Sequence, residues 1–447
     1  MFPFFIVSLL LKVLYAATKK RIPRRGRGTL GAAIFLGLGV GWMGTAPSAT
    51  AQGLGREEVR RQAAALAEVG RRLFFDPGLS ANGSLACASC HDPAHAFGPP
   101  DGAAVRLGGA DGRTPGLRAV PSLKYLQDVP PFAEHYRTPE DEGDESIDNG
   151  PTGGLTWDGR VDGQREQARV PLFSPFEMGN IDPADLSARL ERAGYGAQLR
   201  AAVGVTAGEQ VDVVDLALRA LDVFQQDGPL FHPYTSKYDA YLAGKATLTE
   251  DERRGLEAFE DPARGNCASC HVSRRGNDGT PPHFTDYGLI AIGVPRNRDI
   301  PANADPGYFD QGLCGPLRTD FTGVADYCGR FRTPTLRNVA LRQVFMHNGI
   351  FHTLRQVMEF YAERDSDPGK WYPRRVDGSV MTFDDMPAAA HGAVPAAINM
   401  EAPFGRRPGD APALNERDIH DIIAFLGTLT DGWSAPKTPG PPETAGP

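Results

Sequence analysis

Cysteine is scarce in this chain, with six residues among 447, which is too few to hold a protein of this length together as a disulfide framework. The chain also lacks a collagen-like glycine period and long low-complexity tracts, and 41% of its residues are hydrophobic. At this length a single core stops growing, so we expect two domains. The positions of the six cysteines, rather than their number, must therefore show what they do.

Basic residues are in the minority, with 47 Lys and Arg against 55 Asp and Glu. The first 51 residues contain seven of the basic residues and no acid, so removing this segment changes the net charge from −8 to −15. An anionic body of this kind argues against nucleic acid as a partner. It favours a basic protein or a small molecule.

The acid-free N-terminus has the pattern of a secretory signal peptide. A cationic stretch at 19–28 precedes an apolar stretch at 29–44, and small residues end at Ala51, which predicts a mature protein that begins near Gln52. The apolar residues 2–17 are short for a membrane span and are interpreted as an extended leader or an upstream start. An uncleaved anchor is the alternative. We expect export to the periplasm of a Gram-negative cell, without a membrane anchor.

Four of the cysteines form two C-x-x-C-H motifs, at 87–91 and 267–271. The two thiols of such a motif can form thioethers with the vinyl groups of one haem, and the adjacent His can bind the iron. A zinc site would need further Cys or His pairs at metal spacing, and the sequence has none. We therefore predict two covalently bound haem c groups, attached through Cys87, Cys90, Cys267 and Cys270 and ligated by His91 and His271.

The sequence is organised alike around the two motifs, which indicates an internal duplication. Amphipathic helices are predicted before each motif, over 57–75 and 249–259, and another over 415–430 closes the chain. This is the arrangement of a cytochrome c domain, so we predict a mainly α fold of two such haem domains, with long loops and little strand. The predicted parts are a leader, two haem domains and a disordered tail, at 1–51, 52–240, 241–433 and 434–447.

Together with the haem motifs, the segments 156–179 and 331–361 resemble the bacterial di-haem cytochrome c peroxidase and MauG family over nearly all of the mature chain. The resemblance implies a periplasmic peroxidase-type oxidoreductase that reduces hydrogen peroxide at an open first haem. Electrons would pass through a six-coordinate second haem from a small basic cytochrome c or a cupredoxin. The alternatives are a MauG-like oxidase that modifies side chains of a partner protein, and an electron-transfer cytochrome without peroxide chemistry.

The resemblance also implies catalytic residues. Trp157 matches the Trp that lies between the haems of the family, and Glu177, twenty positions later, matches the catalytic Glu of the open site. Gln167 and Pro171 match two further positions of that pocket in MauG. Cleavage of the peroxide bond requires that a proton move from the inner to the outer oxygen, and a carboxylate held beside the peroxide can both accept and donate it.

The duplication predicts how the two irons differ. The pair Asp158-Gly159 of the first half can be aligned with Asn348-Gly349 of the second. In this alignment Pro171 corresponds to Tyr361, because each lies twelve residues after its glycine. Proline has no donor atom and tyrosine offers an oxygen, so the first iron should be open and the second closed by Tyr361. By the resemblance, this position is Tyr in MauG and Met in peroxidases that take electrons from small cytochromes. The alternative ligands are Met358 and Met346.

Several positions depart from the family. The loop at 98–117 lacks the His that blocks the first iron in many cytochrome-dependent peroxidases, so this site should be open without reductive activation. His135 lies beside an acidic insertion at 139–150, and we expect it to be solvated. The surface Trp through which MauG oxidises its protein substrate corresponds to Gly265.

The calcium site of the family departs as well. Ala119 stands in place of the Asn ligand, and the carbonyl positions correspond to Arg342 and Val344. A guanidinium could take the place of the metal there, which argues against calcium.

Cys314 and Cys328 flank a loop of the second domain. In an oxidising compartment we favour a disulfide between them, with a reactive thiol pair as the alternative.

Overall fold

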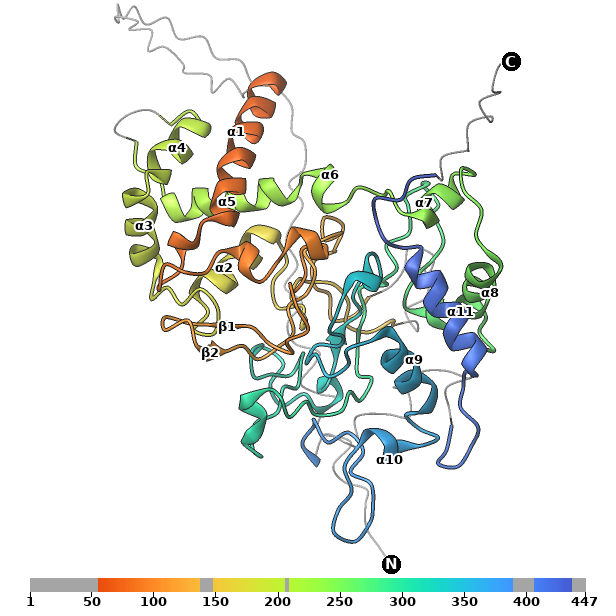
Figure 1. Cartoon of the computed structure of the whole chain (residues 1–447). Helices are drawn as coiled ribbons and strands as arrows, with labels where there is room; N and C mark the ends of the chain where they lie inside the picture. The colour runs from red at the N-terminus through yellow and green to blue at the C-terminus, as the bar shows by residue number, and fades with distance from the viewer. Residues whose placement is uncertain (1–54, 137–147, 206–208, 389–405, 436–447) are drawn as a thin grey trace, which may run out of the picture. The chain divides into compact units, whose positions relative to one another are not determined.

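The computed structural model describes residues 55–136, 148–205, 209–388 and 406–435 (Figure 1). The predicted signal peptide, most of the acidic insertion and all but two residues of the predicted tail lie outside these residues. In the described part, helices dominate the regular structure and strands form only two short ribbons, so the prediction of a mainly α fold is confirmed. No helix in these ranges has the length and the apolar run that a membrane crossing needs.

The described helices and strands are distributed over the whole chain. The helices are α1 (Arg56–Phe75), α2 (Gln164–Phe173), α3 (Pro183–Arg192), α4 (Tyr195–Ala202), α5 (Val213–Gln225), α6 (Gly228–Phe231), α7 (Lys237–Leu242), α8 (Glu250–Glu260), α9 (Leu354–Glu363), α10 (Pro368–Trp371) and α11 (Glu416–Gly427). The strands pair as two antiparallel ribbons, β1 (Leu107–Gly108) with β2 (Thr114–Pro115) and β3 (Leu289–Ile290) with β4 (Phe331–Arg332).

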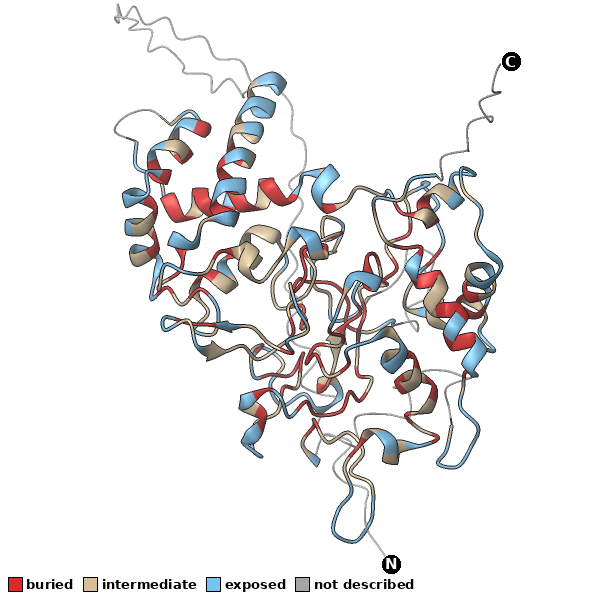
Figure 2. Ribbon diagram, in the orientation of Figure 1, coloured by how far each residue is buried: buried red, intermediate tan, exposed pale blue. Residues whose placement is uncertain are grey.

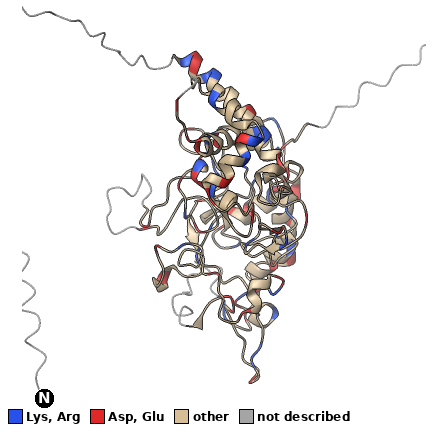
Figure 3. Ribbon diagram, turned by 90° about the vertical axis from the view of Figure 1, so that its left-hand side faces the viewer, with Lys and Arg blue, Asp and Glu red and all other residues tan. Residues whose placement is uncertain are grey.

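Local capping explains where the predicted helices begin. The Thr249 side chain accepts a hydrogen bond from the Glu252 N–H, and the Glu252 carboxylate accepts one from the Thr249 N–H, which starts α8 as a capping box. Asn415 caps α11 in the same way by accepting from the Asp418 N–H. In α1, acidic residues lie in the first turn and a basic residue in the last turn, and residues of both charges occur along the helix (Figure 3). All three helices predicted from the sequence are confirmed, with their ends shifted by at most three residues.

Each half contains a close crossing of two helices. Helix α1 packs against α5, and α8 packs against α11 (Figure 1). A Cβ atom at Gly70 would overlap the Ala220 carbonyl oxygen, and one at Gly255 would overlap the Asp421 carbonyl oxygen. Only glycine lets two helix backbones approach this closely. The likeness of the two crossings supports the internal duplication, which stays a prediction.

Two hydrophobic cores lie on either side of residue 235. One is built from residues between Leu66 and Phe231, and the other from residues between Tyr238 and Leu429. Helix α5 is buried along most of its length (Figure 2). The predicted domain boundary near residue 240 falls beside this division.

Buried ion pairs join the two halves near the middle of the chain. The Arg118 guanidinium lies 2.7 Å from the Asp158 carboxylate and 2.6 Å from that of Asp310. Arg318 donates to the carbonyl oxygens of Asp158 and Gly159 at 3.0 and 2.9 Å. The segment that follows Trp157 is thereby fixed to residues far along the chain. Cys314 and Cys328 form a disulfide, which confirms the favoured pairing.

Candidate active site

The first haem-attachment motif is a short 3-10 turn over Cys87–Ser89, and both of its thiols are free of disulfides. The His91 Nδ1 atom lies 3.0 Å from the Phe97 carbonyl oxygen. This bond fixes the tautomer and leaves Nε2 available to a metal. Burial lowers the pKa of His91 to about 4, so the ring is neutral, as iron ligation requires.

The second motif repeats this arrangement. Cys267–Ser269 forms the turn, and the His271 Nδ1 atom lies 2.9 Å from the Phe284 carbonyl oxygen. Both phenylalanines that supply these carbonyls have a positive φ, 53° for Phe97 and 55° for Phe284. A non-glycine residue adopts this conformation at a cost, so the surrounding structure must impose it.

The two motifs fit c-type haem. Burial raises the pKa of Cys87 and of Cys267 to about 12, so both groups are thiols at neutral pH before haem is attached. Each motif combines two cysteines that form no disulfide with a neutral imidazole whose Nδ1 atom is occupied by a carbonyl. This set supplies two sulfur atoms for thioether bonds and one nitrogen for iron.

Tight backbone contacts position Glu177. Its N–H donates to the Ser174 carbonyl oxygen at 3.1 Å, and its own carbonyl oxygen accepts from the Gly109 N–H at 2.7 Å. A Cβ atom at Gly108 would overlap the carbonyl oxygens of Phe176 and Glu177. The glycine pair at the end of β1 therefore allows this ribbon to hold the Glu177 backbone in place.

The Glu177 carboxyl lies close to the first motif. Its negative charge contributes to the raised pKa values of Cys87 and Cys90, in which burial is the largest cause. The Glu177 side chain still reaches solvent, but the surrounding protein desolvates it and raises its pKa, against the opposing charge of Arg160 and a hydrogen bond from Ser174. The structure thus brings the sequence-predicted acid to the His91 site.

The other residues predicted for this pocket lie on α2. Gln167 and Pro171 are one turn apart and so share a face of the helix. The Pro171 carbonyl oxygen accepts a hydrogen bond from the Met178 N–H at 3.0 Å. This bond folds the residues around Glu177 back onto the end of α2.

Trp157 lies between segments of both halves. Its Nε1–H donates to the Ala119 carbonyl oxygen at 2.8 Å, and its own carbonyl oxygen accepts from the Arg332 N–H at 2.8 Å. The side chain is partly buried and lines a cavity that also contains His271.

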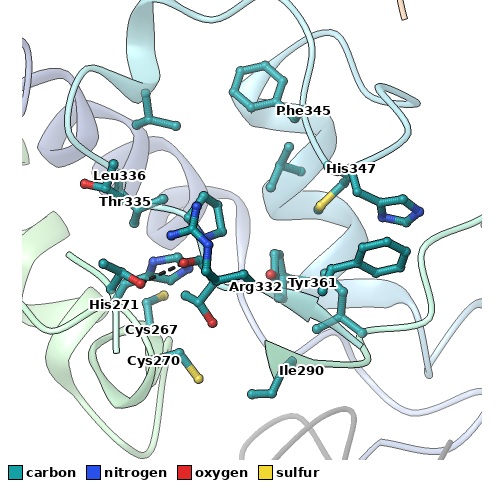
Figure 4. Close-up of a pocket in the computed structure, with 18 of the residues that line it drawn as sticks. Cys267, Cys270, His271, Ile290, Arg332, Thr335, Leu336, Phe345, His347 and Tyr361 are labelled. Atoms are coloured by element: carbon teal, nitrogen blue, oxygen red, sulfur yellow. Dashed lines mark hydrogen bonds between the residues drawn. The ribbon is translucent and has the colours of Figure 1, made fainter. Parts of the chain in front are cut away.

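This cavity surrounds the second motif and contains every candidate for the second ligand (Figure 4). In Figure 4 His271 and Tyr361 lie on opposite sides of it, with the sulfurs of Cys267 and Cys270 near His271. Helix α9 begins at a Thr353 capping box and turns one face, which includes Met358 and Tyr361, toward the cavity. Met346 lines the same cavity.

The electrostatics of Tyr361 place its phenol near the second motif. Burial raises the pKa of Tyr361 above its usual range, and the Cys270 and Cys267 thiols add to this increase. The cavity geometry accommodates Tyr361, Met358 and Met346 alike, so the ligand stays a prediction.

The remaining predicted positions are also found. His135 is exposed, and its Nδ1 atom lies 2.7 Å from an Asp148 carboxylate oxygen, in agreement with a solvated role. A Cβ atom at Gly265 would overlap the Ala258 carbonyl oxygen, so this backbone has no room for a side chain where MauG carries its Trp. Arg342 donates to the Val344 and Val120 carbonyl oxygens, both at 3.1 Å. A guanidinium thus lies where the resemblance places the calcium.

Sequence reasoning missed Arg332, which lines the cavity beside His271 and belongs to β4. It also missed the carbonyl oxygens of Phe97 and Phe284 as partners of the two histidines. Arg332 is the second residue of the segment 331–361 that carried the family resemblance, and this was the available signal. The two carbonyls had none, because their positions depend on backbone conformation.

Comparisons with known proteins agree with this geometry. A family model described as di-haem cytochrome c peroxidase matches residues 64–247. The methylamine utilization protein MauG of Paracoccus denitrificans is 33% identical over 386 residues, which cover 84% of this chain and 91% of that protein. The cytochrome c551 peroxidase of Nitrosomonas europaea is 26% identical over 66% of this chain and 72% of its own length. The crystal structure of the diheme peroxidase BthA from Burkholderia thailandensis matches with a TM-score of 0.69 and 41% identity, over 82% of this chain and 86% of that one.

Proposed function

Because the chain belongs to the di-haem cytochrome c peroxidase and MauG family and is an oxidoreductase with two c-type haems, we propose that it reduces hydrogen peroxide beside His91 in the periplasm. When bound, the haems supply the redox chemistry, which is to take up electrons and pass them on. The residues of the chain hold the two groups, move the proton and set the difference between the sites.

The position of Glu177 carries this proposal. Its carboxyl lies close to Cys87 and Cys90, and desolvation by the surrounding protein raises its pKa. A carboxylate with a raised pKa accepts a proton from one peroxide oxygen more readily than an ordinary Glu does, and it can return the proton to the other oxygen. Reduction of one peroxide to two waters consumes two electrons and two protons, and Glu177 is the group through which a proton passes.

Tyr361 is the proposed ligand at the second site, with Met358 and Met346 as the alternatives. An anionic oxygen ligand favours higher oxidation states, whereas a thioether favours the reduced state. The second site would therefore store an oxidising equivalent, with Trp157 lying between the two sites. Electrons would come from a small basic cytochrome c or cupredoxin, because the chain without its first 51 residues has a net charge of −15.

The substitution Glu177→Gln tests the proposal. It removes the acid and base function but keeps the shape of the side chain, so peroxide turnover should fall by about 10²–10⁴-fold. The absorption spectrum of both haems should stay unchanged. Glu166→Gln, at an exposed position of α2, is the matched control and should keep full turnover. Full activity of Glu177→Gln with an intact spectrum would refute the role of this residue.

A second candidate function is oxidation of side chains in a partner protein, as in MauG. The relatives include MauG at 33% identity. In addition, the Tyr361 phenol lines the second cavity together with the thioethers of Met358 and Met346. Gly265 leaves no room for the Trp of MauG, so any such reaction would use another surface. Mass spectrometry of the exported protein encoded beside this one, after treatment with peroxide, distinguishes the two functions. A pure electron-transfer cytochrome would instead show two six-coordinate, low-spin ferric haems.

A further inference from the structure

Buried guanidiniums in this protein usually lie against carboxylates. Arg118 is bonded to Asp158 and Asp310, and both Arg337 nitrogens donate to Asp239 at 2.9 Å. Burial opposes the charge of Arg118 and of Arg337, but their carboxylate partners outweigh this effect and raise both pKa values. Such pairing is what allows a charge to be buried.

Arg332 and Arg342 differ from these residues. Arg332 is 9% exposed, and its Nε–H donates to the Thr156 carbonyl oxygen at 3.2 Å. Arg342 donates only to the Val344 and Val120 carbonyl oxygens. Within the described ranges, neither guanidinium has a carboxylate partner. Burial accordingly lowers the pKa of each to about 10.

Arg332 is buried and Arg342 is partly buried, and a desolvated cation without a counter-ion is expensive to maintain, so their site is built for an anion. Carbonyl oxygens satisfy some of the N–H groups but do not neutralise the charge. A guanidinium has five N–H donors in a planar fork that fits a carboxylate. Within the described ranges, the Arg332 side chain uses one of these donors and the Arg342 side chain two, so donors remain for a ligand.

The two arginines flank Trp157. The backbone N–H of Arg332 donates to the Trp157 carbonyl oxygen. The Trp157 ring N–H donates to the Ala119 carbonyl oxygen. The carbonyl oxygen of the next residue, Val120, accepts a hydrogen bond from the Arg342 guanidinium. All three side chains line the cavity that contains His271. Figure 4 shows Arg332 between His271 and Tyr361.

Arg342 also reaches toward the first site. A Cβ atom at Gly98 would lie 3.5 Å from an Arg342 nitrogen, and Gly98 directly follows Phe97, whose carbonyl oxygen binds His91. The charge of Arg342 further lowers the pKa of His91, for which burial is the main cause. One arginine thus belongs to the second site and the other lies between the two sites.

We propose that Arg332 and Arg342 would hold haem propionates in the cavity that Trp157 lines. Each haem c carries two propionate carboxylates, which are the anions that this fold brings to the cavity. The inference rests on the two haems and is independent of the peroxide chemistry proposed for Glu177. A fixed positive charge beside a haem favours the reduced iron, so these residues also raise the reduction potential.

The test is a spectroelectrochemical titration of the holoprotein variants Arg332→Gln and Arg342→Gln. The haem potentials should shift to lower values, and they should become more dependent on pH near neutrality because a propionate without its guanidinium takes up a proton more readily. Arg318→Gln is the matched control. Arg318 is 6% exposed and donates to carbonyl oxygens next to Trp157, but it is paired with Asp320 and does not line the cavity. The haem reduction potentials of Arg318→Gln should equal those of the wild type.

Potentials of Arg332→Gln and Arg342→Gln that equal those of Arg318→Gln at every pH would overturn the proposal. If a Gln variant does not incorporate haem, the Lys variants provide the measurement. Arg332→Lys and Arg342→Lys keep the charge at neutral pH and lose it at alkaline pH, so their potentials should match the wild type at pH 7 and fall below it as the lysine deprotonates. A Lys variant without this alkaline fall would also overturn it. The peroxide proposal is tested by the turnover of Glu177→Gln and this proposal by the potentials of the arginine variants, so the failure of one is distinguishable from the failure of the other.

Discussion

The two haem sites are built alike where the cofactor is attached and differ in the other groups that surround them. Each has a C-x-x-C-H turn and a His whose Nδ1 atom is bound by a Phe carbonyl oxygen. Close to the first lies the Glu177 carboxyl, while the second cavity contains the Tyr361 phenol and two methionines. The two halves therefore share their attachment chemistry, while one segment of each half, 156–179 and 331–361, supplies the residues in which the sites differ.

The halves also differ in how their interiors are stabilised. The second half carries the Cys314–Cys328 disulfide, whereas the thiols of Cys87 and Cys90 in the first half are kept for haem. Both halves share the close helix crossing at Gly70 and at Gly255. The halves thus share the helix crossing and the haem-attachment turns, and they differ in the disulfide and in the other groups near the cofactor sites.

The largest effect is expected from Tyr361→Phe, which would make the second site resemble the first. Phe has nearly the same shape as Tyr but offers no oxygen, so the low-spin ferric EPR signal of one haem should be lost or replaced by a high-spin signal. The signal of the other haem should stay unchanged.

Met358→Leu is the matched control for this variant. It removes the thioether one turn earlier on α9 and keeps the volume of the side chain, so the spectrum should stay as in the wild type. If Met358→Leu changed the low-spin signal and Tyr361→Phe did not, the ligand would be Met358 and the second site would be a relay.

A smaller effect is expected from a methyl group at the two helix crossings. Gly70→Ala and Gly255→Ala each place a Cβ against a carbonyl oxygen of the facing helix, so the helices must move apart. We expect each variant to lower the free energy of unfolding by about 1–3 kcal/mol, as overpacking does. Denaturant unfolding of the holoprotein, followed by circular dichroism, measures this loss.

Gly427→Ala is the control for the crossings, because a Cβ atom there meets no atom within 4 Å at the end of α11. It should cause no loss of stability. Similar losses in the free energy of unfolding at Gly70 and Gly255 would support the equivalence of the two halves. A loss at only one of them would contradict it.

Sequence reasoning succeeded where the information is local. Motif spacing identified the four haem cysteines, and the 3.6-residue period of apolar residues located the helices that form the crossings. It did not find the bonds of Arg118 to Asp158 and Asp310, because these partners lie 40 and 192 residues away. Nor did it find that Arg332 is buried without a carboxylate partner among the residues that the structure describes. Pairings between distant residues are set by the whole fold and leave no periodic signal.

The smallest effect is expected in the pH dependence of peroxide turnover, and it concerns the first site alone. Glu177 must start as a carboxylate in order to accept a proton, so turnover should fall as the pH drops through its pKa. Because the surrounding protein desolvates Glu177 and raises that pKa, the fall should occur at higher pH than for an ordinary Glu, which titrates near ~4.3. The charge of Arg160 opposes the increase. Arg160→Gln removes this charge and should move the acid limb of the kcat/KM profile to still higher pH.

Arg160 also bonds the buried Asp158 at 2.8 Å, so a change in turnover alone could come from a displaced loop. Arg160→Lys keeps the positive charge and should restore the wild-type acid limb, which a purely structural effect would not do. Arg165→Gln removes a guanidinium that pairs with Asp215 on α5 and should leave the limb in place. If the limb moved to lower pH in Arg160→Gln, Glu177 would not be the titrating group, and the carboxyl that distinguishes the first haem site from the second would have no part in proton transfer.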